Sequence, residues 1–263
     1  MDLMKYRYMV LRRISQVSLL LLFMGGNILG WHILRGNLSS SRFFGGIPFS
    51  DPFAIIQIFA TGSLVSAEAL MGALIVTVFF GLVAGRAFCS WVCPLNMVTD
   101  LASWMREKTR VEGADGLSRK ARYWVIGITL VLSVVTGVAA FEWISPISML
   151  YRGVIFGMGA GWTAVLAIFL FDLLIAGNGF CGHLCPLGGF YSLITRFSLI
   201  RVRHDRDKCT QCMRCRAVCP ETQVLPMIGK TSSMVVSGEC TNCARCIEVC
   251  DDDAMRFGIR YIS

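Results

Sequence analysis

Four long apolar stretches constrain the fold of this 263-residue chain more than any other feature of its sequence. Each is close to the length of about 20 residues with which an α-helix crosses a hydrocarbon core of roughly 30 Å. A mean hydropathy of +0.61 and a charged fraction of only 16% also exclude a wholly soluble protein. The sequence therefore predicts an all-α polytopic membrane domain of four transmembrane helices, at residues 14–34, 70–85, 124–141 and 161–176.

The distribution of the 25 Lys and Arg residues predicts the orientation of this domain. Four precede the first stretch, seven lie between the second and the third, and eleven lie from Arg196 onward, whereas the other two connections hold two and one. Positive charge marks the cytoplasmic side of membrane helices. We therefore expect a multi-pass protein of the bacterial inner membrane with both termini in the cytoplasm. The net charge of +8 then reflects topology, and we expect no nucleic-acid partner.

A short cysteine motif occurs twice within the membrane domain. FCSWVCPL at residues 88–95 follows the second stretch, and FCGHLCPL at residues 180–187 follows the fourth, 92 residues later. Asp51-Pro52 and Ser145-Pro146 each offer an N-cap followed by proline, ahead of short apolar runs. The sequence thus predicts an internal two-fold repeat of two helix hairpins, each with a short interfacial helix.

Eight of the twelve cysteines form two runs near the C-terminus, each with the spacing Cys-x2-Cys-x2-Cys-x3-Cys. Three closely spaced thiolates suit a [4Fe–4S] cluster, and the fourth cysteine of such a run ligates the other cluster. We therefore expect a small α+β bacterial 2[4Fe–4S] ferredoxin-like domain over residues 201–263, after the membrane domain over residues 1–200. Cluster I is assigned to Cys209, Cys212, Cys215 and Cys250, and cluster II to Cys240, Cys243, Cys246 and Cys219.

Two structural zinc sites are the alternative for these eight cysteines. Zinc ribbons use one cysteine pair, a long gap and a second pair, not three cysteines within seven residues. A disulfide framework is disfavoured by the reducing cytoplasm. The second run ends in Asp251, where this pattern usually has proline, so its closing turn is less regular.

The other four cysteines form the two Cys-x3-Cys-Pro pairs. On a helix, residues at i and i+4 share one face, and the following proline fits a helix end or kink. If the repeat is symmetric, the four thiols converge near the cytoplasmic interface. They then bind a further cluster or metal, act as a dithiol relay, or pack as small buried hydrophobes. The residues are Cys89, Cys93, Cys181 and Cys185.

Asp172 is an acidic residue inside the fourth apolar stretch. A carboxyl group at the centre of a membrane span is costly, so we expect it to face the bundle interior and to have a partner. It either accepts a proton from a quinol hydroxyl or serves as a hydrogen-bonded structural acid.

Several of these motifs together resemble one family. Besides the two Cys-x3-Cys-Pro pairs and the two four-cysteine runs, they include LRR at residues 11–13, GNLSSS at 36–41, TDL at 99–101 and FDLL at 171–174. The chain resembles the NapH family, the ferredoxin-type membrane subunits of periplasmic nitrate reductase systems. The resemblance covers nearly the whole chain.

The resemblance implies the quinol-oxidising component of a multi-subunit quinol dehydrogenase. Such a subunit takes electrons from menaquinol or ubiquinol and passes them through iron–sulfur clusters towards the periplasmic nitrate reductase. It implies two partners besides the quinol pool, a periplasmic iron–sulfur protein of the NapG type and a small cytoplasmic ferredoxin-type protein.

Two other functions remain open from the sequence. One is a membrane ferredoxin for metal-centre assembly, which reduces a metal ion. The other is a scaffold that uses its clusters to sense redox state. Quinol-dependent reduction of the clusters would favour quinol oxidation, whereas copper(II) reduction would favour metal-centre assembly. In a redox-sensing scaffold, replacement of the cluster cysteines should leave quinol-driven nitrate reduction nearly intact.

Overall fold

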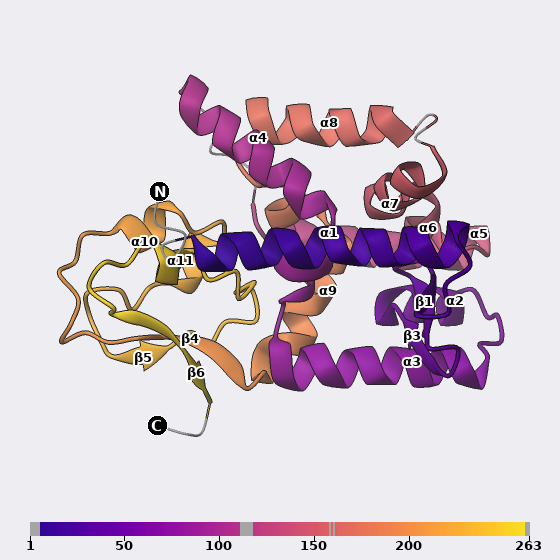
Figure 1. Ribbon diagram of the computed structural model, residues 1–263, viewed down its shortest axis with the longest axis horizontal. Coiled ribbons are helices and arrows are strands. Elements are labelled where there is room, and N and C mark those ends of the chain that lie inside the picture. The colour runs from indigo at the N-terminus through magenta and orange to yellow at the C-terminus, as the bar shows by residue number, and fades with distance from the viewer. Residues whose placement is uncertain (1–5, 111–117, 158, 160, 261–263) are drawn as a thin grey trace. The chain divides into compact units, whose positions relative to one another are not determined.

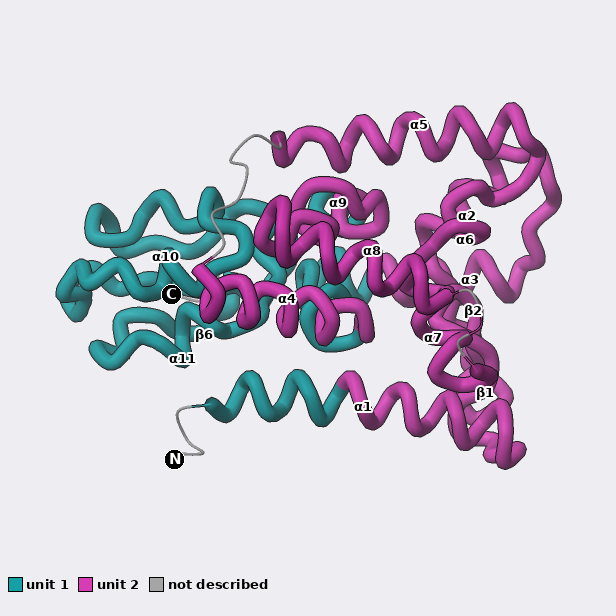
Figure 2. Tube along the Cα trace, turned by 90° about the horizontal axis from the view of Figure 1, so that it is seen from above, with its two compact units in different colours: residues 1–15, 78–92, 191–263 teal, residues 16–77, 93–190 magenta. Residues whose placement is uncertain are grey.

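The computed structural model describes residues 6–110, 118–157, 159 and 161–260 (Figure 1). The chain divides into two compact units, each built from separate segments (Figure 2). Unit 1 comprises the described residues of segments 1–15, 78–92 and 191–263, and unit 2 those of 16–77 and 93–190. The predicted boundary between residues 200 and 201 stays a prediction.

Helices dominate unit 2. In Figure 1 α1, α3 and α8 run along a common direction, and in Figure 2 α1 and α5 follow the same axis. α1 begins in unit 1 and continues into unit 2. The helices are α1 (Arg7–Ile28), α2 (Pro52–Ala60), α3 (Ala67–Val78), α4 (Leu95–Thr109), α5 (Ala121–Thr136), α6 (Ala140–Ile144), α7 (Pro146–Phe156), α8 (Gly161–Leu174) and α9 (Pro186–Ile194).

Two of the described helical stretches are long and apolar enough to cross a membrane by length and composition. They are α1, with 22 residues, and α3 together with the π-helical segment η1 (Phe79–Ala84), with 18 residues. The other two expected spans correspond to shorter apolar helices, α5 with 16 residues and α8 with 14.

The expected first and third spans extend beyond the C-terminal ends of the helices that the structure contains. α1 ends at Ile28 rather than at residue 34, because Gly30 takes the left-handed φ of 75° and Trp31 folds back on Gly25. α5 ends at Thr136, where Gly137 at φ 69° closes the helix. A separate short helix, α6, follows it.

The expectation of an all-α membrane domain is wrong for one segment. Residues 34–50 form an antiparallel sheet in the order β1-β2-β3. The carbonyl of Gly36 at its start accepts hydrogen bonds from Tyr151 Oη at 2.7 Å and from Asn27 Nδ2 at 2.8 Å. The contact from Tyr151 is long-range, so the short polar sequence of this segment does not by itself indicate the sheet. Its strands are β1 (Leu34–Gly36), β2 (Ser40–Phe43) and β3 (Ile47–Ser50).

The two predicted N-caps are confirmed. Asp51 accepts a hydrogen bond from Phe53 N at the start of α2, and Ser145 accepts one from Ser148 N at the start of α7. Proline occupies the first helical turn in both.

The C-terminal part of unit 1 combines a small sheet with two single-turn helices. The sheet has the order β5-β4-β6, with both neighbours antiparallel to β4. Its buried core includes Val202, Val224, Leu225, Val235 and Met255. The elements are β4 (Ile200–His204), α10 (Arg214–Ala217), β5 (Ser233–Met234), α11 (Arg245–Glu248) and β6 (Met255–Ile259).

Candidate metal centres

Two loops with one backbone geometry begin the cysteine runs of the tail. In the first loop Gln211 and Met213 both have a φ of 59°, and in the second Asn242 and Ala244 have φ values of 49° and 62°. One helical turn follows each loop, α10 or α11. Alternating left- and right-handed residues turn successive backbone N–H groups to one side, an arrangement found at many iron–sulfur sites.

The first pocket of the tail draws its cysteines from both runs. Cys209, Cys212 and Cys215 line it together with Cys250, the last cysteine of the second run. His204 also lines it, and its side chain is only 1% exposed. His204 Nδ1 donates to the Thr231 carbonyl at 2.8 Å, whereas Nε2 has no hydrogen-bond partner among the described residues.

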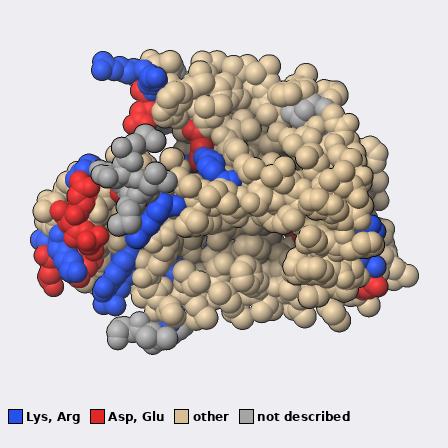
Figure 3. Space-filling model, in the orientation of Figure 1, with Lys and Arg blue, Asp and Glu red and all other residues tan. Residues whose placement is uncertain are grey.

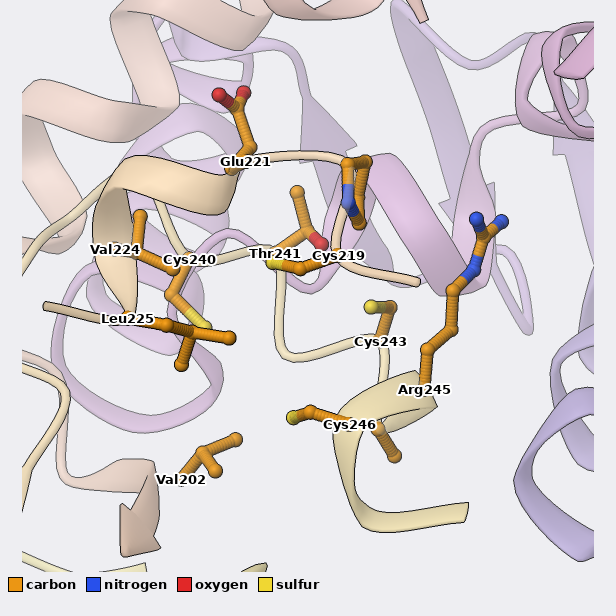
Figure 4. A pocket seen from close by; sticks show the side chains of 12 residues that line it. Val202, Cys219, Glu221, Val224, Leu225, Cys240, Thr241, Cys243, Arg245 and Cys246 are labelled. Atoms are coloured by element: carbon orange, nitrogen blue, oxygen red, sulfur yellow. The ribbon is translucent and has the colours of Figure 1, made fainter. Parts of the chain in front are cut away.

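The second pocket has the reciprocal composition. Cys240, Cys243 and Cys246 line it with Cys219, the last cysteine of the first run (Figure 4). Val202, Val224 and Leu225 close its apolar side. Burial raises the pKa of Cys219 to about 12 and that of Cys240 to about 11, so both thiols are protonated near neutral pH.

The donor sets of the two pockets suit [4Fe–4S] clusters. Each iron of such a cluster takes one thiolate, so the four sulfurs surround a body instead of meeting at a point. Within the described ranges, no three His, Cys, Asp or Glu side chains are gathered closely enough to hold a single metal ion. Each pocket instead combines three cysteines of one run with the last cysteine of the other, which is the ligand pattern expected of two [4Fe–4S] clusters.

The second loop is bound by a distant segment of unit 1. Ser90 Oγ donates to the Thr241 carbonyl at 2.7 Å, and Trp91 Nε1 donates to the Asn242 carbonyl at 3.1 Å. Asn242 Nδ2 in turn donates to the carbonyls of Ala84 and Ile200, both at 2.9 Å. Residues 84–91, which include Cys89, thus cover one side of the second cysteine loop.

A buried ion pair reinforces this contact. Arg86 Nη1 lies 2.8 Å from Glu221 Oε1, and the two side chains are 1% and 4% exposed. The same guanidinium donates to the Glu239 carbonyl at 3.1 Å. Sequence reasoning missed both residues. The available signals were an arginine directly after an apolar span and a glutamate directly after Cys219-Pro220.

The two Cys-x3-Cys-Pro motifs share one local structure. The first cysteine of each lies in a π-helical turn, η2 (Phe88–Val92) or η3 (Phe180–Leu184). The proline that follows the second cysteine is the N-cap residue of α4 in the first motif and the first residue of α9 in the second. Cys93 and Cys185 are each 5% exposed, whereas Cys89 and Cys181 are half-buried. The expected ordinary helix is thus a wider turn, a feature frequent at functional sites.

The structure assigns these cysteines to different units. Cys89 belongs to unit 1, and Cys93, Cys181 and Cys185 belong to unit 2. Cys181 Sγ lies 4.0 Å from Thr99 Oγ1, and Gly188 N donates to Cys185 Sγ at 3.4 Å. The convergence of all four thiols stays a prediction.

Asp172 is fully buried in α8 and touches the second motif. Its Oδ1 accepts a hydrogen bond from Phe180 N at 2.8 Å, at the start of the turn that carries Cys181. Its Oδ2 has no hydrogen-bond partner among the described residues. Arg106 Nη1 donates to the backbone carbonyl of Asp172 at 3.3 Å. One carboxyl oxygen thus holds the start of the turn that carries Cys181, and the other makes no hydrogen bond within the described residues.

The fold of the tail and its two four-cysteine pockets define the class of a ferredoxin-type iron–sulfur protein. A family model described as a 4Fe-4S binding domain matches residues 66–112 and 154–204, and each part holds one Cys-x3-Cys-Pro motif. A model for a 4Fe-4S dicluster domain matches residues 201–251.

Within this class, the chain belongs to the NapH and MauN family of ferredoxin-type proteins. It is 44% identical to ferredoxin-type protein NapH of Haemophilus influenzae, over 97% of this chain and 91% of that protein. It is 44% identical to methylamine utilization ferredoxin-type protein MauN of Paracoccus denitrificans, over 89% of this chain and 84% of that protein. NapH of Escherichia coli is 43% identical over 88% of this chain and 82% of its own length. No solved structure matches the chain.

Proposed function

We propose that this protein is a membrane electron-transfer subunit that oxidises menaquinol or ubiquinol on behalf of a periplasmic nitrate reductase system. The two four-cysteine pockets carry the proposal, because each combines cysteines from both runs. The similarity to NapH proteins over most of the chain supports the nitrate reductase assignment.

Two [4Fe–4S] clusters are the cofactors of this proposal. Cys209, Cys212, Cys215 and Cys250 hold the first, and Cys240, Cys243, Cys246 and Cys219 hold the second. Each cluster, when bound, supplies a one-electron redox centre. The buried thiols lose their protons on binding, so loading is coupled to proton release.

Quinol oxidation releases two electrons and two protons. Asp172 is the proposed acceptor of one proton, through the Oδ2 atom that its hydrogen bond to Phe180 N leaves available. The other proton leaves to solvent, and the eight tail cysteines would hold the one-electron centres that take up the two electrons. Cys89, Cys93, Cys181 and Cys185 are proposed redox or ligand thiols between the quinol and the tail.

The proposed setting is the inner membrane, with four spans in two related halves and both termini and the tail in the cytoplasm. The two long apolar helical stretches and the two shorter ones support it. The proposed partners are a periplasmic NapG-type iron–sulfur protein and a cytoplasmic ferredoxin-type protein.

The chain is also 42% and 44% identical to two proteins named for methylamine utilization, so the similarity is not specific to nitrate reductase systems. The second candidate function is a membrane ferredoxin that reduces a metal ion during assembly of another protein's metal centre, or a redox-sensing scaffold.

One experiment tests the proposal and separates these functions. The protein is purified anaerobically in detergent, its iron and acid-labile sulfide are counted, and quinol is added while EPR follows the reduced clusters. We expect about eight irons per chain and a signal that rises with quinol but not in Asp172→Asn. Iron that only dithionite reduces would exclude quinol oxidation, and copper(II) reduction would then support the assembly function.

A further inference from the structure

The two cysteine loops of the tail are copies of one another. TQCMRC at residues 210–215 and TNCARC at residues 241–246 differ at two of six positions. Their left-handed residues occupy equivalent positions, and both lead into a helical turn. The loops therefore share one backbone geometry and differ in side chain only at Gln211 against Asn242 and Met213 against Ala244.

Equivalent residues of the two loops differ in their exposure to solvent. Met213 in the first loop is 41% exposed, whereas its counterpart Ala244 is 1% exposed. Gln211 is exposed, whereas its counterpart Asn242 is buried. Cys212 is also exposed, although cysteine is among the residues most often buried.

The cover of the second loop comes from residues 84–91, through the hydrogen bonds of Ser90 and Trp91. Within the described part of the chain, no corresponding segment hydrogen-bonds to the first loop. Its side-chain contacts are local to the tail. Thr210 binds Asp252 through Oγ1 at 2.6 Å, and Arg214 lies 2.7 Å from Asp251.

We propose that residues 211–214 form the docking surface on which a soluble electron-transfer protein approaches the first cysteine pocket. The second pocket is instead approached from within the chain, through residues 84–91. This inference rests on the proposed iron–sulfur function. It assigns a direction to electron transfer, with the protein's own membrane segment at the second pocket and the partner at the first.

The chemistry of the surface indicates the kind of partner. Met213 is an exposed apolar centre, and the half-exposed Arg214–Asp251 pair and the exposed Arg216 lie in the same or neighbouring segments. Figure 3 shows both signs of charge interspersed in this part of unit 1. Methionine and arginine are enriched at protein interfaces, which have an apolar centre and a polar rim. Transient redox complexes use small contacts of this kind.

The reaction at this surface is a simple electron exchange. One electron leaves the reduced protein and reduces one equivalent of the partner's metal centre. No covalent bond forms or breaks, and no proton moves. The requirement is close approach to the first pocket, which Met213 also lines.

The test uses cytochrome c, a small basic haem protein, as the soluble acceptor. The full-length protein is reduced with dithionite and desalted, and stopped-flow absorbance follows the reduction of cytochrome c. Met213→Arg should slow the second-order rate about tenfold at low ionic strength, and Met213→Glu should accelerate it, since charge steers encounter. Both effects should disappear at about 1 M salt, where the Debye length is roughly 3 Å.

Val236→Arg and Val236→Glu are the matched controls, because Val236 is another exposed apolar residue of the tail, at 62% exposure. Iron content and the EPR signal normalise every rate. Opposite effects of the two charges at Met213, with little effect at Val236, support the proposal. Equal effects at both positions, or none at Met213, would overturn it.

A second pair of variants covers a loss of iron in the Met213 variants. Gln211→Arg and Gln211→Glu change an exposed residue of the same loop that does not line the pocket. The outcome is separable from the proposed function. Dithionite bypasses quinol, so a protein that quinol fails to reduce can still confirm or refute the docking surface.

Discussion

Asp51 lies at the N-terminus of α2, where its carboxyl group accepts a hydrogen bond from Phe53 N at 3.0 Å. The residue is only 9% exposed. Burial, with the nearby charge of Glu142 as a smaller cause, raises the pKa of Asp51 to about 7. A helix cap of this protein therefore titrates near physiological pH.

Asp51→Asn should remove this pH dependence and keep the cap, since asparagine caps helices as well as aspartate does. The folded state holds the Asp51 proton more tightly than the unfolded chain does. The group therefore contributes stability below a pH of about 4, and this contribution, at most about 4 kcal/mol, is lost as the pH rises to about 7. The unfolding temperature in detergent, measured by circular dichroism, should decrease less between about pH 4 and about pH 7 in the variant than in the wild-type protein. Equal decreases in the unfolding temperature of the two proteins would show that Asp51 is not the titrating group.

At the scale of elements, sequence patterns predict those features that depend on contacts between residues close together in the chain. The caps of α2 and α7 follow from Asp51-Pro52 and Ser145-Pro146. The spacing of the two cysteine runs predicts which four cysteines line each pocket of the tail. The sheet of residues 34–50 was not predictable, because its first strand depends on Tyr151, far along the chain. The Arg86–Glu221 pair was not predictable either, because its members are 135 positions apart in the sequence.

Gly26 and Gly127 offer a test of packing within helices. A Cβ atom at Gly26 would lie 1.8 Å from the carbonyl oxygen of Leu34, so Gly26→Ala must displace β1 from α1 and destabilise the fold. A Cβ atom at Gly127 in α5 meets nothing within 4 Å. Gly127→Ala should therefore stabilise the protein by about 0.5–1 kcal/mol. Unfolding temperatures in detergent should move in opposite directions.

Arg86→Ala should weaken the contact between residues 84–91 and the second cysteine loop. Removing one partner of a buried ion pair costs about 3–5 kcal/mol, and Gln223 Nε2, which donates to Glu221 Oε2 at 2.7 Å, does not replace the lost positive charge. We expect the second pocket to lose its iron faster than the first when the purified protein meets a chelator. EPR and iron release measure this loss.

Arg42→Ala is the control for Arg86→Ala. Arg42 pairs with Glu68, but the two side chains are 58% and 66% exposed, so the loss of this pair should change little. Equal rates of iron release from the two variants would show that the buried pair does not hold the second loop.

At the scale of the whole molecule, the distribution of Lys and Arg predicts which connections face the cytoplasm. The connection between α2 and α3 is predicted to face the periplasm, and α4 the cytoplasm. Leu64 in the first segment and Trp104 in the second are both exposed. They are therefore suitable positions for measuring orientation.

Leu64→Cys should react with a membrane-impermeant maleimide in intact spheroplasts, whereas Trp104→Cys should react only after the membrane is opened. The wild-type protein, with its twelve native cysteines, gives the background. The reverse labelling pattern would show that the topology is inverted and that the tail lies in the periplasm.

The binding of the second cysteine loop by residues 84–91 also has a consequence for biogenesis. Ser90 and Trp91 precede Thr241 and Asn242 by about 150 residues, so during synthesis the covering segment is made well before the loop that it binds. The cysteines of both pockets come from the tail alone, but the backbone of the second loop gains its hydrogen bonds from Ser90 and Trp91 only when both segments have folded together. We therefore expect cofactor insertion into the second pocket to depend on correct placement of residues 84–91, so that a chain in which this segment is misplaced would hold iron in the first pocket only.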